Sequence, residues 1–191
     1  MMKMAFFLLA VSASLFAPAA PVQAQAQNSK KILVAYFSHT QTTKKVALEI
    51  HQRVGGDIFK IETVQAYPAE HRETVDFAEK ERDSNARPAL KAKVENMESY
   101  DVIFLGYPIW WYTLPMSLFT FLESYDLSGK TIIPFSTHGG SRMSGTEEVI
   151  RKLQPEARVS AGLAVSRNVI RNNPETGAVK PVADWLSKLK Y

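Results

Sequence analysis

The sequence has no cysteine, few glycines and no concentration of charge of one sign. Without cysteine the chain cannot form a disulfide or use a thiol as a nucleophile, so an oxidising compartment is tolerated but not required. Its 9 glycines form neither Gly-x-x-x-x-Gly-Lys nor Gly-x-Gly-x-x-Gly, which excludes the usual triphosphate loop and the dinucleotide fingerprint. Gly-x-Ser-x-Gly is absent too, so the sequence predicts no serine nucleophile elbow.

Charge is nearly balanced along the chain. The formal net charge is +4, from 23 Lys and Arg against 19 Asp and Glu, and no block of basic residues stands out. Proteins that bind nucleic acid usually carry a basic stripe together with a recognisable reading motif. We therefore expect an ordinary solvated charged surface and no nucleic-acid partner.

The N-terminal segment differs in composition from the remainder. A single early charge, Lys3, precedes an apolar stretch over 5–16, followed by small residues and proline. This pattern is typical of a secretory signal peptide at 1–24, with cleavage after Ala24 or Ala26. The apolar stretch is shorter than the roughly 20 residues that a membrane span needs. We expect an exported protein, located in a bacterial periplasm, with no stable membrane span once the leader is removed.

Short apolar runs alternate with helical patterns along the remainder of the chain. Strands are expected at 31–37, 57–62, 100–108, 130–140 (running into a loop) and 157–166, and helices at 46–54, 66–83, 114–125, 146–155 and around Val182, Leu186 and Leu189. Five such alternations predict one α/β domain over 30–191, a three-layer doubly wound sandwich whose parallel sheet is covered on both faces. Ligands of such folds bind beyond the carboxyl ends of the strands, which directs attention to the loops at 38–43, 106–113 and 136–145.

The first of these loops carries four hydroxyl side chains just before a helix: Ser38, Thr40, Thr42 and Thr43. The first N–H groups of a helix have no internal partner, and the helix dipole favours an anion there. Two lysines follow at 44–45, where positive charge is unfavourable unless a bound anion offsets it. Capping of the helix is the alternative, but it needs only one hydroxyl, so the segment favours a phosphate site.

The second loop contains adjacent tryptophans, Trp110 and Trp111, between a buried strand and a helix. Large aromatic side chains on a loop expose apolar surface unless a flat group covers them. A planar heteroaromatic ring would do so. The alternative is that one tryptophan packs into the core and the other against a neighbouring loop.

The third loop contains a glycine pair at 139–140, which allows the backbone N–H groups to approach a ligand closely. His138 could place a proton donor or a positive charge beside that ligand, or could be a solvated loop histidine. The same alternatives hold for His39. These two histidines have no further ligand cluster beside them, so no metal site is predicted. His51 and His71 lie on expected helix surfaces and are assigned no function.

These three segments resemble those of the flavodoxin-like flavoproteins, and most closely a subgroup similar to NAD(P)H-quinone oxidoreductases. Tyr36–Thr43 matches Tyr-Phe-Ser-x-Thr-x-x-Thr, Gly106–Trp111 matches Gly-x-Pro-Ile-Trp-Trp, and Pro134–Ser141 matches Pro-Phe-x-Thr-x-Gly-Gly-Ser. The segment 67–90 is similar to the second-strand loop and helix of that subgroup. The resemblance covers about 31–190 and implies a five-stranded parallel sheet of order 2-1-3-4-5 with FMN as the cofactor.

The resemblance also implies which residues hold the cofactor. The phosphate would be bound by Ser38, His39, Thr40, Gln41, Thr42 and Thr43, the ring would be flanked by Pro108, Ile109, Trp110, Trp111 and Tyr112, and its pyrimidine edge would meet Thr137, His138, Gly139 and Gly140. His138 is the candidate catalytic residue. Relatives usually have glycine where Gln41 stands and often where Tyr112 stands, so a positive φ at position 41 would be strained here.

The resemblance leaves three functions open. The first is an FMN-dependent oxidoreductase that exchanges electrons with a quinone-type or similar aromatic acceptor. The second is an electron-transfer flavodoxin without its own substrate, although such carriers are usually acidic and this chain retains a charge of +3 after loss of Lys3. The third is a protein that binds FMN or another phosphate ligand without turnover. A small-molecule or protein redox partner is expected, and an oligomer is compatible with each of the three.

Overall fold

A computed structural model describes residues 30–191, so the expected leader at 1–24 lies outside the described part of the chain. The strands are β1 (Ile32–Tyr36), β2 (Asp57–Lys60), β3 (Val102–Pro108), β4 (Thr131–His138), β5 (Arg158–Val159) and β6 (Leu163–Ser166). The helices are α1 (Thr42–Val54), α2 (His71–Asp83), α3 (Met116–Glu123), α4 (Thr146–Leu153), α5 (Arg167–Asn172) and α6 (Val179–Leu186), with a single 3₁₀ turn, η1, at Met97–Ser99. None of the helices within 30–191 is long and apolar enough to cross a membrane.

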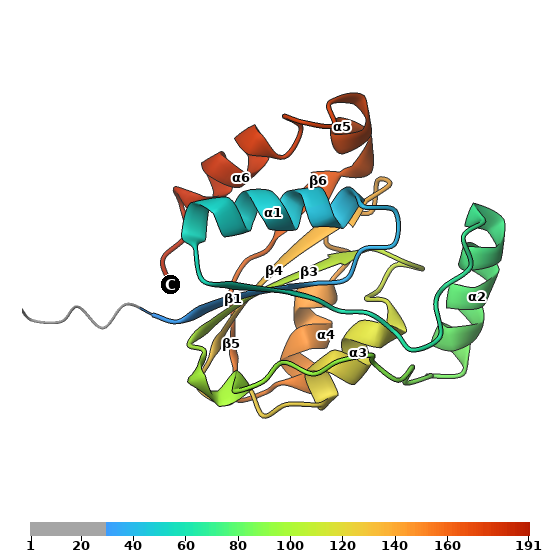
Figure 1. Ribbon diagram of the computed structural model, residues 1–191, viewed down its shortest axis with the longest axis horizontal. Coiled ribbons are helices and arrows are strands. Elements are labelled where there is room, and N and C mark those ends of the chain that lie inside the picture. Colours follow the sequence, from blue (N-terminus) through green and yellow to red (C-terminus); the bar gives the residue numbers. More distant parts are fainter. Residues whose placement is uncertain (1–29) are drawn as a thin grey trace, which may run out of the picture.

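The strands form one parallel sheet in the order β2-β1-β3-β4-β5, and β6 also pairs with β4. In Figure 1, α1, α5 and α6 lie on one side of the sheet and α3 and α4 on the other, while α2 stands apart at one end of the molecule. The predicted three-layer sandwich and its strand order are therefore confirmed.

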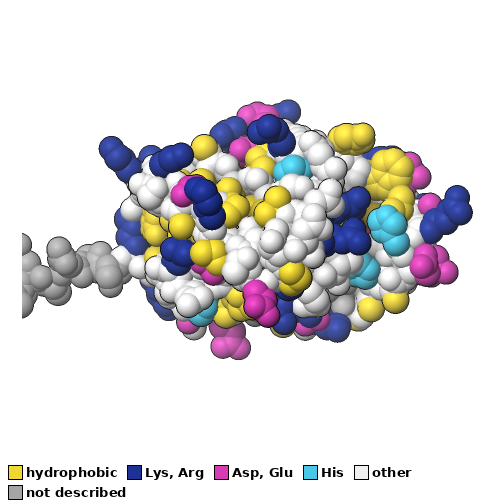
Figure 2. All heavy atoms as spheres, turned by 90° about the horizontal axis from the view of Figure 1, so that it is seen from above, with side chains coloured by type: hydrophobic (Ala, Val, Ile, Leu, Met, Phe, Trp, Pro, Cys, Tyr) yellow, Lys and Arg dark blue, Asp and Glu magenta, His cyan; other side chains and the backbone are white. Residues whose placement is uncertain are grey.

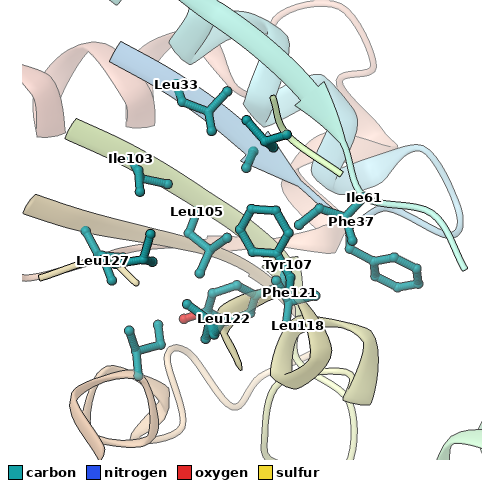
Figure 3. Packing of buried hydrophobic residues seen from close by; sticks show 14 of the residues in the cluster. Leu33, Phe37, Ile61, Ile103, Leu105, Tyr107, Leu118, Phe121, Leu122 and Leu127 are labelled. Carbon is teal, nitrogen blue, oxygen red and sulfur yellow. The ribbon is translucent and has the colours of Figure 1, made fainter. Parts of the chain in front are cut away.

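Alternate residues of the central strands supply two separate cores. Leu33 of β1 and Leu105 of β3 face α3 and α4, whereas Val34 and Phe104 face α1 and α6, and all four side chains are buried. Figure 3 shows the first core, where side chains of β1 and β3 meet those of α3. Burial on both faces explains why these strands appear in the sequence as continuous apolar runs instead of alternating ones.

The fifth strand, predicted as one segment at 157–166, is interrupted in the structure. β5 pairs with 131–132 and β6 with 135–138, so the break lies opposite Ile133 and Pro134. The N–H of Ser160 donates to the carbonyl of Ile132, so the backbone groups of residue 132 point toward the segment that contains β5 and β6. Every second residue of a strand points its backbone groups to the same side, so those of residue 134 also point toward this segment. Proline has no N–H to donate, and the ladder is broken at that point.

Three helix predictions also need correction. α2 begins at His71 instead of 66, because Glu70 has extended backbone and its carboxylate accepts the N–H of Arg72 as an N-cap. The short helix α5 was not predicted; the Ser166 hydroxyl caps it by accepting from Asn168 N–H. The last helix ends at Leu186, so the predicted Leu189 lies beyond it.

Candidate functional site

A cavity of about 680 Å³ opens where the carboxyl ends of β1, β3 and β4 meet α2. The sequence predicts the loops after these three strands as the ligand-binding edge, and the structure brings all three around this one space. Thirteen of the fifteen predicted site residues line it: His39, Thr40, Thr42, Thr43, Pro108, Ile109, Trp110, Trp111, Tyr112, Thr137, His138, Gly139 and Gly140. Ser38 and Gln41 are the two that do not.

Hydroxyl groups surround the N-terminus of α1. The Ser38 hydroxyl accepts a hydrogen bond of 3.1 Å from the N–H of Lys44, so it caps the helix, while the hydroxyls of Thr40 and Thr42 lie 3.2 Å apart at the cavity. Capping therefore accounts for one of the four hydroxyls of this loop. Those of Thr40 and Thr42 remain available as donors beside the first N–H groups of the helix, an arrangement suited to an oxyanion.

Gln41 adopts the left-handed conformation, with φ of 63°, directly before α1. Its side chain makes no capping hydrogen bond to the helix. Relatives usually have glycine at this position, and the backbone here does have the positive φ that glycine tolerates. A residue with a Cβ, such as Gln41, is strained in this conformation. The strain falls on the backbone of the hydroxyl-rich first loop, directly before α1.

The second loop closes in a tight turn between Trp110 and Thr113. Trp110 N–H donates to the carbonyl of Thr113 at 3.1 Å, and Thr113 N–H donates back to Trp110 at 2.9 Å. The two central residues, Trp111 and Tyr112, both have positive φ, of 45° and 62°. Turns of this kind favour glycine and asparagine, so two bulky aromatic residues here store backbone strain at the wall of the cavity.

The two tryptophans are held differently. Trp110 is surrounded edge-to-face by Phe37, His39 and Tyr67, with ring centroids at 5.4, 6.0 and 5.0 Å. Its ring therefore belongs to an aromatic cluster under the loop as well as to the cavity. This matches the first part of the alternative, in which one tryptophan packs into the core, because Trp110 is partly buried against the first core.

Trp111 is fixed to α2. Its indole N–H donates to the carbonyl of Val75 at 2.9 Å, and the guanidinium of Arg82 lies 4.8 Å from the ring centroid. Tyr112 lies next to it and is 74% exposed, and none of the described aromatic rings packs against it. Of the three aromatic side chains on the loop, Tyr112 is the one left free to meet a flat ligand.

The third loop joins the first two through backbone and side-chain contacts. Ile109 N–H donates to the carbonyl of Thr137 at 2.8 Å, and the Thr137 hydroxyl lies 2.8 Å from that of Thr43. The Nδ1 atom of His138 accepts from Gly140 N–H at 3.0 Å, which leaves its proton on Nε2. Burial, and then the charge of Arg142, lower the pKa of His138, so the ring is neutral at pH 7 and can act as a hydrogen-bond donor but not as a cation.

Six lining residues were not predicted from the sequence: His71, Thr74, Val75, Ala78, Ser141 and Arg167. The first four come from α2. His71 is exposed on this helix, as expected, and it also lines the cavity. Figure 2 shows histidine side chains in cyan beside dark blue ones at the end of the molecule away from the grey N-terminal segment. No local pattern indicates that α2 closes this wall, because its packing depends on long-range contacts such as that between Val75 and Trp111.

The chemical character of the cavity favours an anion with a flat apolar part. Among the described residues, no Asp or Glu lines it, whereas hydroxyls, histidines and one arginine do. Within 30–191, no three His, Asp or Glu side chains gather as metal ligands would. Hydroxyl and N–H donors lie at the α1 end, and aromatic and aliphatic side chains lie along the second loop and α2.

Comparison with known proteins gives one family and several solved structures. The family model described as flavodoxin matches residues 31–179. A search of curated proteins found no match. Among solved structures, a candidate flavoprotein from Bacteroides eggerthii DSM 20697 is 38% identical, with a TM-score of 0.66 over 78% of this chain and 99% of that one.

Two further structures show the same likeness. A candidate flavoprotein from Bacteroides uniformis ATCC 8492 is 32% identical, with a TM-score of 0.73 over 84% of this chain and 99% of its own. A flavoprotein in complex with FMN from Lactobacillus acidophilus NCFM is 21% identical, with a TM-score of 0.61 over 75% of this chain and 97% of its own. At that identity the third likeness concerns the fold alone.

Proposed function

The chain belongs to the flavodoxin family, and from that premise we propose that it binds FMN in this cavity and acts as an oxidoreductase on a small, quinone-type aromatic acceptor. The observation that carries the proposal is the convergence of three loops and α2 on one space whose described lining has no carboxylate. FMN combines a flat heteroaromatic ring with one phosphate, and the structure offers a matching surface for each part.

The donor set fits the phosphate. The hydroxyls of Thr40 and Thr42 and the free N–H groups at the start of α1 would hold it, and the helix dipole would add to the attraction. Ser38 acts through the backbone, since its hydroxyl fixes the first turn of the helix. The positive charge that Lys44 and Lys45 bring to this turn would be offset by the bound dianion.

The second loop fits the ring. Pro108 and Ile109 form its wall, and the bond from Ile109 N–H to Thr137 holds that wall against β4. Trp111, tied to Val75, fixes the distance between this loop and α2 and so the width of the space that a flat molecule would enter. FMN, when bound, supplies the redox chemistry, because it takes up and releases electrons one or two at a time.

His138 has a defined part in this arrangement. Its lowered pKa keeps the ring neutral at pH 7, and its Nδ1 is occupied by Gly140 N–H, so only Nε2–H can donate. It can therefore hold a proton at Nε2 beside the cofactor without adding charge. Of the alternatives left open for His138 by the sequence, we therefore favour the proton donor.

An aromatic acceptor is supported by the side of the cavity that α2 forms. Val75 and Ala78 give it an apolar surface, and Tyr112 exposes an aromatic ring at the same loop. Flat molecules such as quinones bury well against surfaces of this composition.

Export to a bacterial periplasm is the location we propose. It rests on the signal-peptide pattern alone, and it would require FMN to be acquired after passage through the membrane in an unfolded state. Mass spectrometry of the protein recovered from a periplasmic extract tests it. A mature N-terminus at residue 25 or 27 is expected, and an intact Met1 terminus confined to the cytoplasm would contradict it.

Turnover with purified protein tests the proposed function. FMN-loaded protein should lose its visible flavin absorbance when reduced nicotinamide is added and regain it with a quinone, over many cycles. Reduction by a protein donor without quinone turnover would instead identify an electron carrier. A colourless protein that takes up no added FMN would remove both assignments and leave a binding protein for another phosphate ligand.

A further inference from the structure

Arg167 is a cavity residue that the motifs of the flavin site do not include. It is the first residue of α5 and follows Ser166, which pairs with His138 at the carboxyl end of β4. Its side chain lines the cavity. In Figure 1, α5 lies above the start of α1, and the two helices are in contact.

The guanidinium of Arg167 lies over Gly139. A Cβ atom at position 139 would be 3.3 Å from Cζ of Arg167, which is a tight contact, and 3.4 Å from Nε and 3.5 Å from Nη2, which are ordinary ones. Gly140 needs glycine because its φ is 150°, but Gly139 is not among the residues with positive φ. The guanidinium of Arg167 therefore lies close to the glycine pair of the third loop, at the edge of the cavity.

The charge of Arg167 is not neutralised by the described part of the protein. The guanidinium of Arg167 forms no hydrogen bond or salt bridge with any residue of 30–191, which is also true of several other exposed arginines, such as Arg72 and Arg171; Arg167 is the arginine among them that lines the cavity. The described cavity lining offers no carboxylate either. Arg167 is the one Lys or Arg side chain among the described lining residues, and a guanidinium keeps its charge throughout the ordinary pH range.

We propose that Arg167 binds a negatively charged group of the bound flavin nucleotide, an inference that rests on the proposed function. A guanidinium forms charge-assisted hydrogen bonds to oxyanions with two parallel donors. FMN offers such charge in two places, the phosphate and the pyrimidine part of the ring after two-electron reduction. The shared chemistry is an anion paired with the cation of the cavity lining, and the two sources can be separated by experiment.

Three variants and two flavins make the test. Arg167→Met removes the charge at nearly constant length, Arg167→Lys retains it, and Arg171→Met removes a charge from an exposed residue of the same helix that does not line the cavity. Dissociation constants for FMN and for riboflavin, which lacks the phosphate, are measured by flavin fluorescence quenching. The midpoint potential of the bound flavin is measured by titration, and thermal melting confirms that each variant is folded.

If the phosphate is the partner, Arg167→Met weakens FMN binding about tenfold or more and leaves riboflavin binding unchanged. If the reduced ring is the partner, Arg167→Met weakens the binding of reduced flavin more than the binding of oxidised flavin. Each tenfold difference between these two losses lowers the two-electron potential of the bound flavin by about 30 mV. In both cases Arg167→Lys falls between wild type and Arg167→Met, and Arg171→Met behaves as wild type.

Unchanged affinities and potential in Arg167→Met overturn the inference, and so does an equal effect of Arg171→Met, which would indicate only a general charge effect. The proposed function stands in both cases, because it depends on binding by the wild-type protein. Failure of wild-type protein to take up FMN overturns the proposed function and this inference together.

Discussion

The hydroxyl oxygens of Thr43 and Thr137 lie 2.8 Å apart, and both side chains are buried. This hydrogen bond joins the first turn of α1 to the end of β4, two segments that are far apart in the sequence. It fixes the hydroxyl-rich first loop relative to the third loop, so the shape of the cavity depends on it.

Replacing one member of this pair should cost more than replacing both. Thr43→Val or Thr137→Val leaves the other hydroxyl buried without a partner, and each should lower the free energy of unfolding by about 1–3 kcal/mol. The double variant leaves no unpaired hydroxyl, so it should be clearly more stable than the sum of the single effects predicts. Urea unfolding of the three flavin-free variants measures this, and strictly additive losses would contradict the coupling.

Relief of backbone strain at Gln41 should stabilise the protein. Gln41→Gly removes the Cβ from a residue with φ of 63°, and we expect the free energy of unfolding to rise by up to about 1 kcal/mol. Gln52→Gly is the matched control, because the same replacement inside α1 should destabilise the protein by about 1 kcal/mol. Chemical denaturation distinguishes the two, and a loss of stability in both variants would show that position 41 is not strained.

The aromatic residues of the second loop should separate into structural and ligand-facing side chains. Trp110→Ala removes three edge-to-face contacts and should lower the free energy of unfolding by about 2 kcal/mol or more. Tyr112→Ala should change it by no more than about 0.5 kcal/mol, since the side chain is mostly exposed.

Binding measurements complete this comparison. Tyr112→Ala should weaken FMN binding by about twofold to tenfold, the range expected for loss of one aromatic contact. Equilibrium titration with FMN under native conditions measures the effect. An unchanged dissociation constant would exclude Tyr112 as a contact of the ring.

The Tyr67–Glu81 pair predicts a dependence of stability on pH. Burial raises the pKa of Glu81 above its ordinary value of 4.5, and the hydrogen bond of 2.8 Å that Tyr67 donates offsets this only in part. A raised pKa in the folded state means that the protonated carboxyl favours folding. Its contribution is complete below pH 4.5 and is lost as the pH rises through the folded-state pKa.

Glu81→Gln should therefore gain stability relative to wild type as the pH increases from 4 to about 7. Urea unfolding at several pH values gives the difference. Glu98→Gln, at an exposed position of η1, serves as the matched control for loss of one carboxylate. A difference for Glu81→Gln that is constant across this range would refute the assignment.

The sequence predicts the central strands well, because a strand that is buried on both faces consists of consecutive apolar residues, and this pattern is visible locally. It failed at 157–166, where the break depends on a missing N–H in the adjacent strand, at Pro134. That proline was visible in the sequence, but its effect appears only when the pairing partner is known. A short capped helix such as α5 offers too few residues for a periodic pattern.

The residues of the candidate site also differ in whether a local sequence pattern predicts them. Thr40, Trp111 and Gly140 were found because they lie in loops that directly follow strands of a parallel sheet. Val75 and Arg167 were missed because they reach the cavity through tertiary packing, from within α2 and from the start of α5. No spacing rule connects them to the motifs, and only the folded arrangement shows that they share one space.

Titration of the purified wild-type protein, freed of flavin, with FMN tests the central claim most directly. Flavin fluorescence should be quenched in a saturable manner that ends at one FMN per chain, and the complex should show the visible absorbance of a bound flavin. Fluorescence that stays linear in added FMN, with no retention of flavin after gel filtration, would contradict the account.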